Sequence, residues 1–243
     1  MTPLFPGGVA VSGLQVYDWE AEDYCRGGSP HLHTASTEGY VVTAGAGEVH
    51  TVSAAGRGIR PLHPGEVVWF SPGTVHRLVN HRELELVVVM QNAGLPEAGD
   101  AVLTFPADVL DDPAAYAAAA ALPVDRGEDE RAAAARARRD LAMSGYLELL
   151  ADLETRGTAA LADLHARATR LVQPKVEHWR RVWQSTVEAE TARTRAQLDQ
   201  LASGAPGLMA DAAVERGEPR EGPRAFGMCG RLQTWAWPEV ADV

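Results

Sequence analysis

Residues 28–45 read GSPHLHTASTEGYVVTAG, with two histidines two positions apart and a glutamate five positions after the second. The glutamate begins a run rich in aromatic and β-branched residues, which is typical of a strand. Because side chains alternate faces along a strand, His31 and His33 are predicted to point the same way. Imidazole and carboxylate groups are ligands of first-row transition metals. The stretch therefore predicts a metal site on a β-sheet.

A second stretch supplies a fourth candidate ligand. Residues 65–80 read GEVVWFSPGTVHRLVN, where a Pro-Gly turn delivers His76 onto another β-prone run. We predict that one divalent transition metal ion is bound by His31, His33, Glu38 and His76. Three imidazoles and one carboxylate suit iron, manganese, nickel, copper, cobalt or zinc, and they leave one or two coordination positions open for water or substrate.

The spacing of these residues resembles the two motifs of the cupin family. The first motif is matched by His31-x-His33-x4-Glu38-x6-Gly45, and the second by Gly65-x6-Pro72-Gly73-x2-His76-x3-Asn80. The second departs in one place, because the family usually has proline two residues before the turn glycine, where this chain has Ser71. The resemblance covers roughly residues 9–110. It implies a double-stranded β-helix, or jelly-roll barrel, that holds the metal inside.

The rest of this region agrees with a barrel. Short β-prone runs separated by Gly and Pro turns indicate a β-sandwich or barrel. The predicted strands are 9–19, 40–43, 48–53, 59–62, 66–70, 75–79, 84–90 and 101–105. The run 86–90 is apolar on both faces, so we expect its outer face to be covered by another element or subunit.

Composition changes near Pro123. A helix is predicted at 114–121, capped by Asp111 or Asp112. Residues 125–203 carry apolar residues at helical spacing, which predicts two or three helices packed as a hairpin against the barrel or a partner subunit. We therefore divide the chain into a β-barrel (1–113), a helical extension (114–205) and a tail (206–243). In the tail, 226–229 and 232–237 are predicted strands that could close onto the barrel, with Trp235 and Trp237 on one face.

Composition and charge narrow the class of protein. The chain has 243 residues, 46% of them hydrophobic, and a net charge of −11. Acidic residues outnumber basic ones in residues 1–125, which argues against a surface for nucleic acid or anionic membranes there. The two cysteines, Cys25 and Cys229, imply no disulfide framework. Neither a signal peptide nor a membrane-spanning apolar run is evident, so we expect a cytoplasmic protein.

Three functions are open at this point. The resemblance implies a metal-dependent enzyme acting on a small molecule, because cupins with all four ligands are frequently dioxygenases or oxidases. A second alternative is a non-redox enzyme whose metal serves as Lewis acid in an isomerisation, a lyase step or a rearrangement. A third is a non-catalytic module that binds a metabolite. The intact ligand set favours the enzymes.

Two residues near the ligands are candidate catalytic groups. Glu38 could detach from the metal and act as a base, and Tyr40 could donate a hydrogen bond to substrate from the same strand face. Asn80 could position a ligand or cap a turn.

We also expect a homodimer. The run 86–90 and an apolar helical stripe both need cover, and a short barrel wall is too small for the whole stripe. The stripe includes Leu171, Val172, Val176, Trp179 and Trp183. The helical extension is therefore predicted to contribute to the dimer interface.

Overall fold

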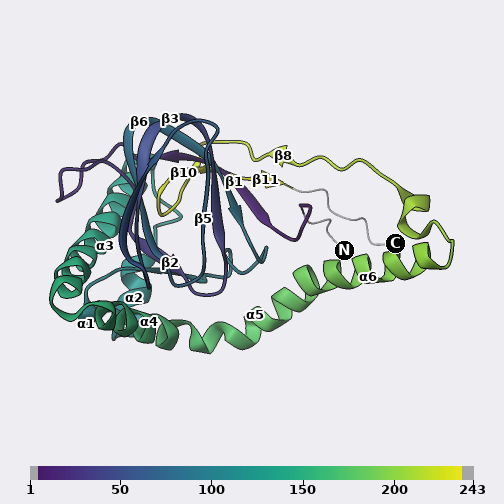
Figure 1. Ribbon diagram of the computed structural model, residues 1–243. Coiled ribbons are helices and arrows are strands. Elements are labelled where there is room, and N and C mark those ends of the chain that lie inside the picture. Colours follow the sequence, from purple (N-terminus) through teal and green to yellow (C-terminus); the bar gives the residue numbers. More distant parts are fainter. Residues whose placement is uncertain (1–4, 237–243) are drawn as a thin grey trace.

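The structure is a computed structural model that describes residues 5–236. It combines a β-barrel with helices that cover one side and then extend away from it (Figure 1). The strands are β1 (Ala10–Val16), β2 (His31–His33), β3 (Glu38–Ser53), β4 (Gly56–Leu62), β5 (Val67–Phe70), β6 (Val75–Met90), β7 (Ala101–Leu103), β8 (Glu218–Pro219), β9 (Ala225–Phe226), β10 (Gly230–Gln233) and β11 (Trp235–Ala236). The α-helices are α1 (Ala107–Leu110), α2 (Pro113–Ala120), α3 (Glu128–Arg156), α4 (Thr158–Val172), α5 (Val176–Trp183) and α6 (Ala189–Ala202).

Two strands of 16 residues, β3 and β6, build the barrel. They pair antiparallel along almost their whole length, while β5 borders the first part of β3 and β4 its last part. The register shifts between Val42 and Gly47, where the chain bends. Gly45 lies in this bend at φ 75°, and an added Cβ would be 2.2 Å from the Arg82 carbonyl oxygen. The runs predicted as separate strands at 40–43 and 48–53 are therefore joined by a bulged bend.

The C-terminal tail returns to the barrel as a strand. β10 pairs antiparallel with β1, from Gly13 opposite Gln233 to Val16 opposite Gly230, and β9 pairs with β10. The sheet order is β4-β3-β6-β1-β10-β9. The predicted strand 232–237 is divided between β10 and β11, and Trp237 lies outside the described residues.

Helices α3 and α4 share a hydrophobic core with the barrel. Side chains from both parts pack into one buried cluster, including Leu32, Val75, Val102, Met143, Tyr146, Leu161 and Leu164. Asp112 caps α2 by accepting hydrogen bonds from the backbone N–H of Ala114 (2.8 Å) and Ala115 (3.2 Å). The fold class predicted from sequence, a jelly-roll barrel followed by helices, is confirmed.

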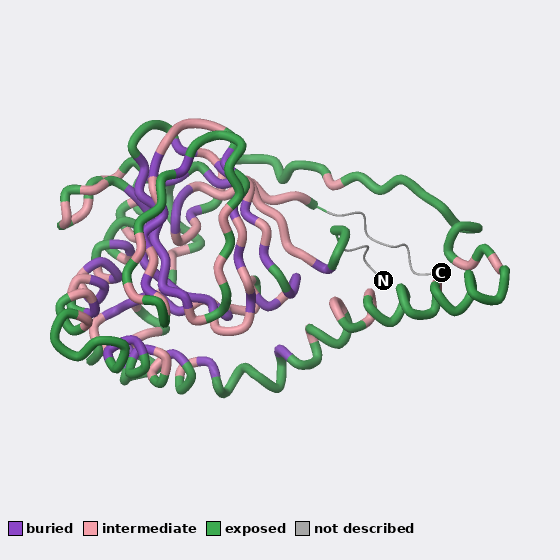
Figure 2. Tube along the Cα trace, viewed as in Figure 1, coloured by how far each residue is buried: buried purple, intermediate pink, exposed green. Residues whose placement is uncertain are grey.

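The last helices form an arm that leaves the barrel. The short 3₁₀ segment Gln173–Lys175 contains Pro174, and α5 and α6 continue the helical path beneath and beyond the barrel (Figure 1). Most of this arm is exposed (Figure 2). Trp179 is buried against the barrel side, and its Nε1 donates to the Ala98 carbonyl at 3.2 Å. The apolar stripe predicted to need a partner is thus partly covered within the chain.

None of the helices in residues 5–236 combines the length and the apolar character needed to cross a lipid bilayer.

Candidate metal centre

The four predicted ligands lie together inside the barrel. His31 and His33 are both on β2, Glu38 begins β3, and His76 is near the start of β6. The backbone register places His31 directly opposite His76. All four side chains are buried, and each offers one ligand atom within 4.8 Å of all the others. The structure therefore brings together every ligand predicted from the sequence.

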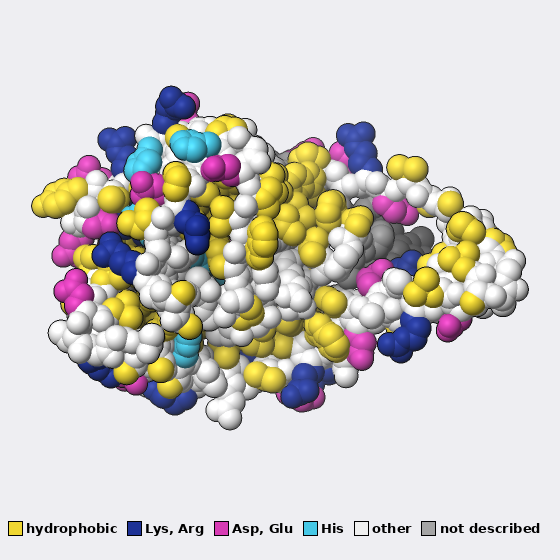
Figure 3. Space-filling model, viewed as in Figure 1, with side chains coloured by type: hydrophobic (Ala, Val, Ile, Leu, Met, Phe, Trp, Pro, Cys, Tyr) yellow, Lys and Arg dark blue, Asp and Glu magenta, His cyan; other side chains and the backbone are white. Residues whose placement is uncertain are grey.

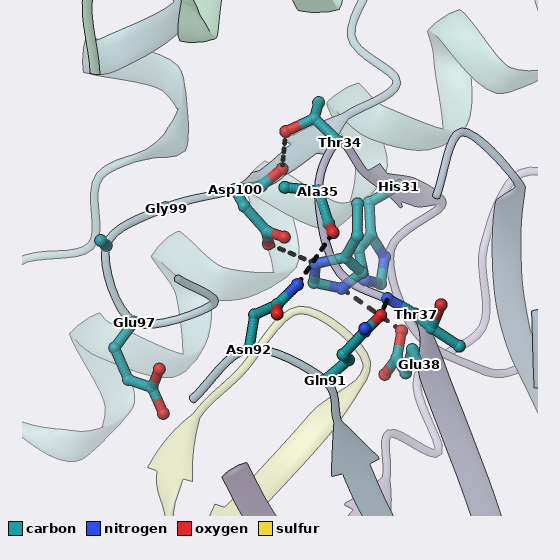
Figure 4. Close-up of polar contacts among 12 residues, drawn as sticks. His31, Thr34, Ala35, Thr37, Glu38, Gln91, Asn92, Glu97, Gly99 and Asp100 are labelled. Atoms are coloured by element: carbon teal, nitrogen blue, oxygen red, sulfur yellow. Dashed lines mark hydrogen bonds and ion pairs between the residues drawn. The ribbon is translucent and has the colours of Figure 1, made fainter. Parts of the chain in front are cut away.

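Each histidine is oriented by an acceptor outside the cluster. The Nδ1 of His31 lies 3.0 Å from the Ser29 carbonyl oxygen, and that of His76 lies 3.1 Å from the Thr74 carbonyl oxygen. The Nδ1 of His33 lies 2.6 Å from Oδ1 of Asp100 (Figure 4). A carbonyl oxygen can only accept, so these Nδ1 atoms carry hydrogen and the Nε2 atoms face the centre.

The spacing of the inward atoms fits a metal ion. Oε2 of Glu38 lies 2.9 Å from Nε2 of His76 and 3.3 Å from Nε2 of His33. The Nε2 atoms of His31 and His76 are 3.1 Å apart. Ligands about 2.1 Å from a transition metal and at right angles to one another are about 3.0 Å apart. Oε2 of Glu38 also lacks a properly aligned hydrogen bond within the described residues. Acceptors converging at this spacing suit a shared cation.

The ionisation of the cluster supports the same conclusion. Burial, with the neighbouring imidazoles, holds the pKa of His31 well below its usual value. Burial acts against protonation of His33 too, but the neighbouring carboxylates of Asp100 and Glu38 raise the pKa of His33 to about 10. Burial alone would raise the pKa of Glu38, yet His76 and His33 hold it well below the usual range. In the metal-free chain, the raised pKa favours a protonated His33, whose positive charge lies between the carboxylates of Asp100 and Glu38.

Metal binding is therefore expected to release about one proton per ion at neutral pH, because His33 must lose its proton to become a ligand. Calorimetric titration of the metal-free chain at pH 7.5, in buffers with different ionisation enthalpies, measures this number. Asp100→Asn, which removes the carboxylate that stabilises the charged imidazole, is expected to release clearly less. Equal release from both proteins, or none from the wild type, would contradict the assignment.

Asp100 was not predicted from the sequence. It is fully buried, and its backbone carbonyl also accepts from the Thr34 side chain at 3.0 Å. Asp100 is 67 residues from His33, at the end of a polar loop that leads into β7. A single acidic residue in such a loop carries no local signal of its role, so only the tertiary structure reveals it.

Two other candidate residues, Tyr40 and Asn80, are buried in the barrel. Tyr40 is fully buried and packs edge-on against Phe70, with ring centroids 5.4 Å apart. Burial and the nearby Glu38 carboxylate raise the pKa of Tyr40 well above its usual value. Asn80 donates to the Val16 carbonyl and accepts from the Leu84 N–H, each at 3.0 Å. Of the two roles considered for Asn80, the structure shows the turn-stabilising one.

Two buried arginines hold the segment that leads into β2. Arg139, on α3, donates to the carbonyl oxygens of Trp19 (2.7 Å) and Glu20 (2.8 Å). Arg77, on β6, binds the Asp23 carboxylate and donates to the Cys25 carbonyl oxygen at 3.2 Å. Arg139 thereby connects α3 to the segment that leads to His31, and Arg77 connects the same segment to β6.

A cavity of about 300 Å³ opens beside the centre. His31, His33 and Glu38 line its polar end, and Glu97 lies at its rim on the loop that ends at Asp100 (Figure 4). Tyr40 is not among the cavity residues. A buried ligand set beside an accessible cavity allows a small molecule to reach the metal position.

The chain has limited similarity to several solved structures. Three solved structures illustrate it. An uncharacterized conserved protein from Klebsiella pneumoniae with a double-stranded β-helix domain is 18% identical, over 38% of this chain and 75% of its own, with a TM-score of 0.31. The nucleoside dehydratase Pac13 from Streptomyces is 17% identical, over 40% and 69%, with a TM-score of 0.31. Oxalate decarboxylase from Bacillus subtilis, which has Mn(II) centres, is 18% identical, over 40% and 24%, with a TM-score of 0.33.

At such identities the likeness concerns the fold alone. No curated protein matches the chain. The Cupin domain family matches residues 25–90, the part that contains all four predicted ligands. This match and the barrel architecture support a cupin domain in this part of the chain.

Proposed function

We propose that the chain is a metal-dependent enzyme that performs an oxygenase- or oxidase-type reaction on a small molecule. The observation that carries the proposal is the buried set of His31, His33, Glu38 and His76, three of which line the 300 Å³ cavity. A redox-active ion in this set would supply Lewis acidity and electron transfer. The chain's own residues would hold the ion, exclude bulk water and position the substrate.

Side chains of the cavity other than the ligands are poorly suited to acid–base catalysis, which favours a reaction at the metal. Apart from the ligands, the described residues around the cavity include two groups that titrate, Cys229 and Glu97. Burial and the Glu38 carboxylate raise the pKa of Cys229 far above neutral, so this thiol keeps its proton. Glu97 is exposed, and its carboxylate accepts from the Gly94 N–H at 2.8 Å. Neither is placed to move a proton at the metal.

Glu38 remains the candidate base of the proposal. It lines the cavity, and if it detached from the ion its carboxylate would be free to accept a proton from the substrate. We propose that Tyr40 acts through Glu38 as a positioning residue, because the two side chains are close and Tyr40 does not reach the cavity. A non-redox isomerase or lyase would also need a base at this position. A non-redox reaction is therefore the alternative to the oxygenase-type reaction.

Oxygen uptake by the purified full-length protein distinguishes the two. The protein would be mixed with small enolisable and hydroxylated compounds, and dissolved oxygen and product would be measured together. We expect metal-dependent oxygen consumption, which His76→Ala abolishes. Conversion of a compound without oxygen consumption, in a protein that holds zinc, would overturn the oxygenase proposal in favour of the alternative.

A homodimer is also proposed, with a contact surface revised by the structure. Val172 and Trp179 of the predicted stripe are buried within the chain. An apolar outer face remains where β3 and β5 pair, because Val41 lies opposite Val67 and Trp69 is 71% exposed. Hydrophobic side chains gather over this side of the barrel (Figure 3). In the described residues β5 pairs with β3 alone, which leaves an edge for the same strand of a second copy.

Light scattering of the full chain is expected to give twice the monomer mass at micromolar concentration. Trp69→Lys should give a monomer, because a buried charge at the contact has no partner. Tyr24→Lys is the matched control, since Tyr24 is 86% exposed elsewhere on the surface. A wild type that is monomeric, or a Trp69→Lys variant that stays dimeric, would contradict this interface.

A further inference from the structure

The cavity beside the metal centre has one polar end and apolar walls. His31, His33 and Glu38 form the polar end, and β1 and β6 form one wall. That wall includes Leu14 and Val88, both buried. A molecule entering the cavity therefore meets ligands and metal at one end and hydrocarbon along its sides.

The C-terminal tail extends this wall, because β10 lies next to β1 in the sheet and Leu232 pairs with Leu14. Met228, Cys229 and Leu232 line the cavity about 200 positions after His31 in the sequence. The pairing of β10 with β1 holds this wall in place. The fit is close, because a Cβ added to Gly28 would lie 2.4 Å from the Cα of Cys229. The wall is therefore a built part of the site.

The charges around the cavity restrict its ligand. None of the described residues that line it is lysine or arginine. Apart from Glu38, its one charged side chain in residues 5–236 is the rim carboxylate of Glu97. An anionic group placed away from the metal would lose its hydration without gaining a partner, and Glu97 would repel it. A divalent ion with Glu38 leaves one positive charge, which suits a single neutral or monoanionic head.

We propose, on the basis of the proposed function, that the cavity binds a compact molecule with one oxygen-bearing, metal-binding head and an uncharged apolar body. The body lies along the apolar wall that β6, β1 and the tail form together, where Met228 and Leu232 select its shape. A cavity of about 300 Å³ lies at the small end of the range of ligand sites, which favours a compact ligand. Compounds with a second charged end, such as dicarboxylates and phosphate esters, are excluded.

The test uses two hydroxamic acids that differ at one position, benzohydroxamic acid and 4-carboxybenzohydroxamic acid. Both chelate metals through the same head, and the second adds an anionic end. Calorimetry with the metal-loaded full-length protein is expected to show at least tenfold tighter binding of the uncharged probe. Leu232→Arg is expected to reduce this preference at least tenfold, with metal content unchanged. Leu198→Arg on exposed α6 adds the same charge away from the cavity and should keep the wild-type preference.

Thr234→Arg provides a second cationic variant at the cavity if Leu232→Arg does not fold. Equal binding of the two probes, tighter binding of the carboxylated one or no binding of either by the metal-loaded protein would overturn the inference. The proposed function would survive that result if the protein still held its metal and consumed oxygen. Absence of metal from the wild type would instead remove the proposed function itself.

Discussion

Removal of the bound metal is expected to lower the melting temperature of the full-length protein by about 10 °C. The ion would join side chains from β2, β3 and β6, so it binds the folded barrel and not the unfolded chain. An ion present at a thousand times its dissociation constant stabilises the fold by about 4 kcal/mol. For a chain of this size each kcal/mol corresponds to about 2–4 °C. Scanning calorimetry before and after chelation measures the shift.

Two controls belong to this experiment. Adding back the metal should restore the original melting temperature. His33→Ala should melt at the same temperature with and without chelator, because it has lost a ligand. An unchanged melting temperature after verified removal of the metal would show that the ion does not join these strands.

Replacement of Arg139 by methionine is expected to lower the free energy of unfolding by about 2–4 kcal/mol, because two backbone carbonyl oxygens lose a charged donor. The guanidinium is fully buried, and it is the hydrogen-bond donor to the carbonyl oxygens of Trp19 and Glu20. Methionine fills similar space but leaves these carbonyls without that donor. The segment they belong to leads to His31, so metal affinity should fall as well. Urea denaturation and metal titration measure the two effects.

Arg195→Met is the matched control, because Arg195 is exposed on α6. It makes the same chemical change and should alter stability by less than about 0.5 kcal/mol. If Arg139→Met were as stable as this control, the arginine would not be what fixes the helices to the entry segment of the metal centre.

The clustering of the four candidate ligands could be predicted from sequence because their positions follow from local spacing. Two histidines on one strand face and a histidine after a Pro-Gly turn are patterns within short stretches. The same holds for α2, whose cap at Asp112 and alanine-rich body are adjacent in the chain. The fold class followed from the turn spacing and from the resemblance that these motifs carry.

Features that depend on distant pairing could not be predicted in this way. Asp100 becomes the partner of His33 only when β7 pairs with β2, with residue 101 opposite residue 33. The tail forms a cavity wall only because β10 pairs with β1. Nothing local in either segment indicates its partner. The sequence predicted two strands in place of the long strand β3, because a glycine such as Gly45 is also typical of turns. In the structure Gly45 lies in a β-bulge.

Elemental analysis of three purified proteins tests the central claim most directly. The proteins are the wild type, His76→Ala, and His63→Ala as a control that changes an exposed histidine outside the cluster. The proposed metal site predicts close to one transition metal ion per chain in the wild type and in His63→Ala, and almost none in His76→Ala. Equal metal content in the wild type and His76→Ala would contradict it.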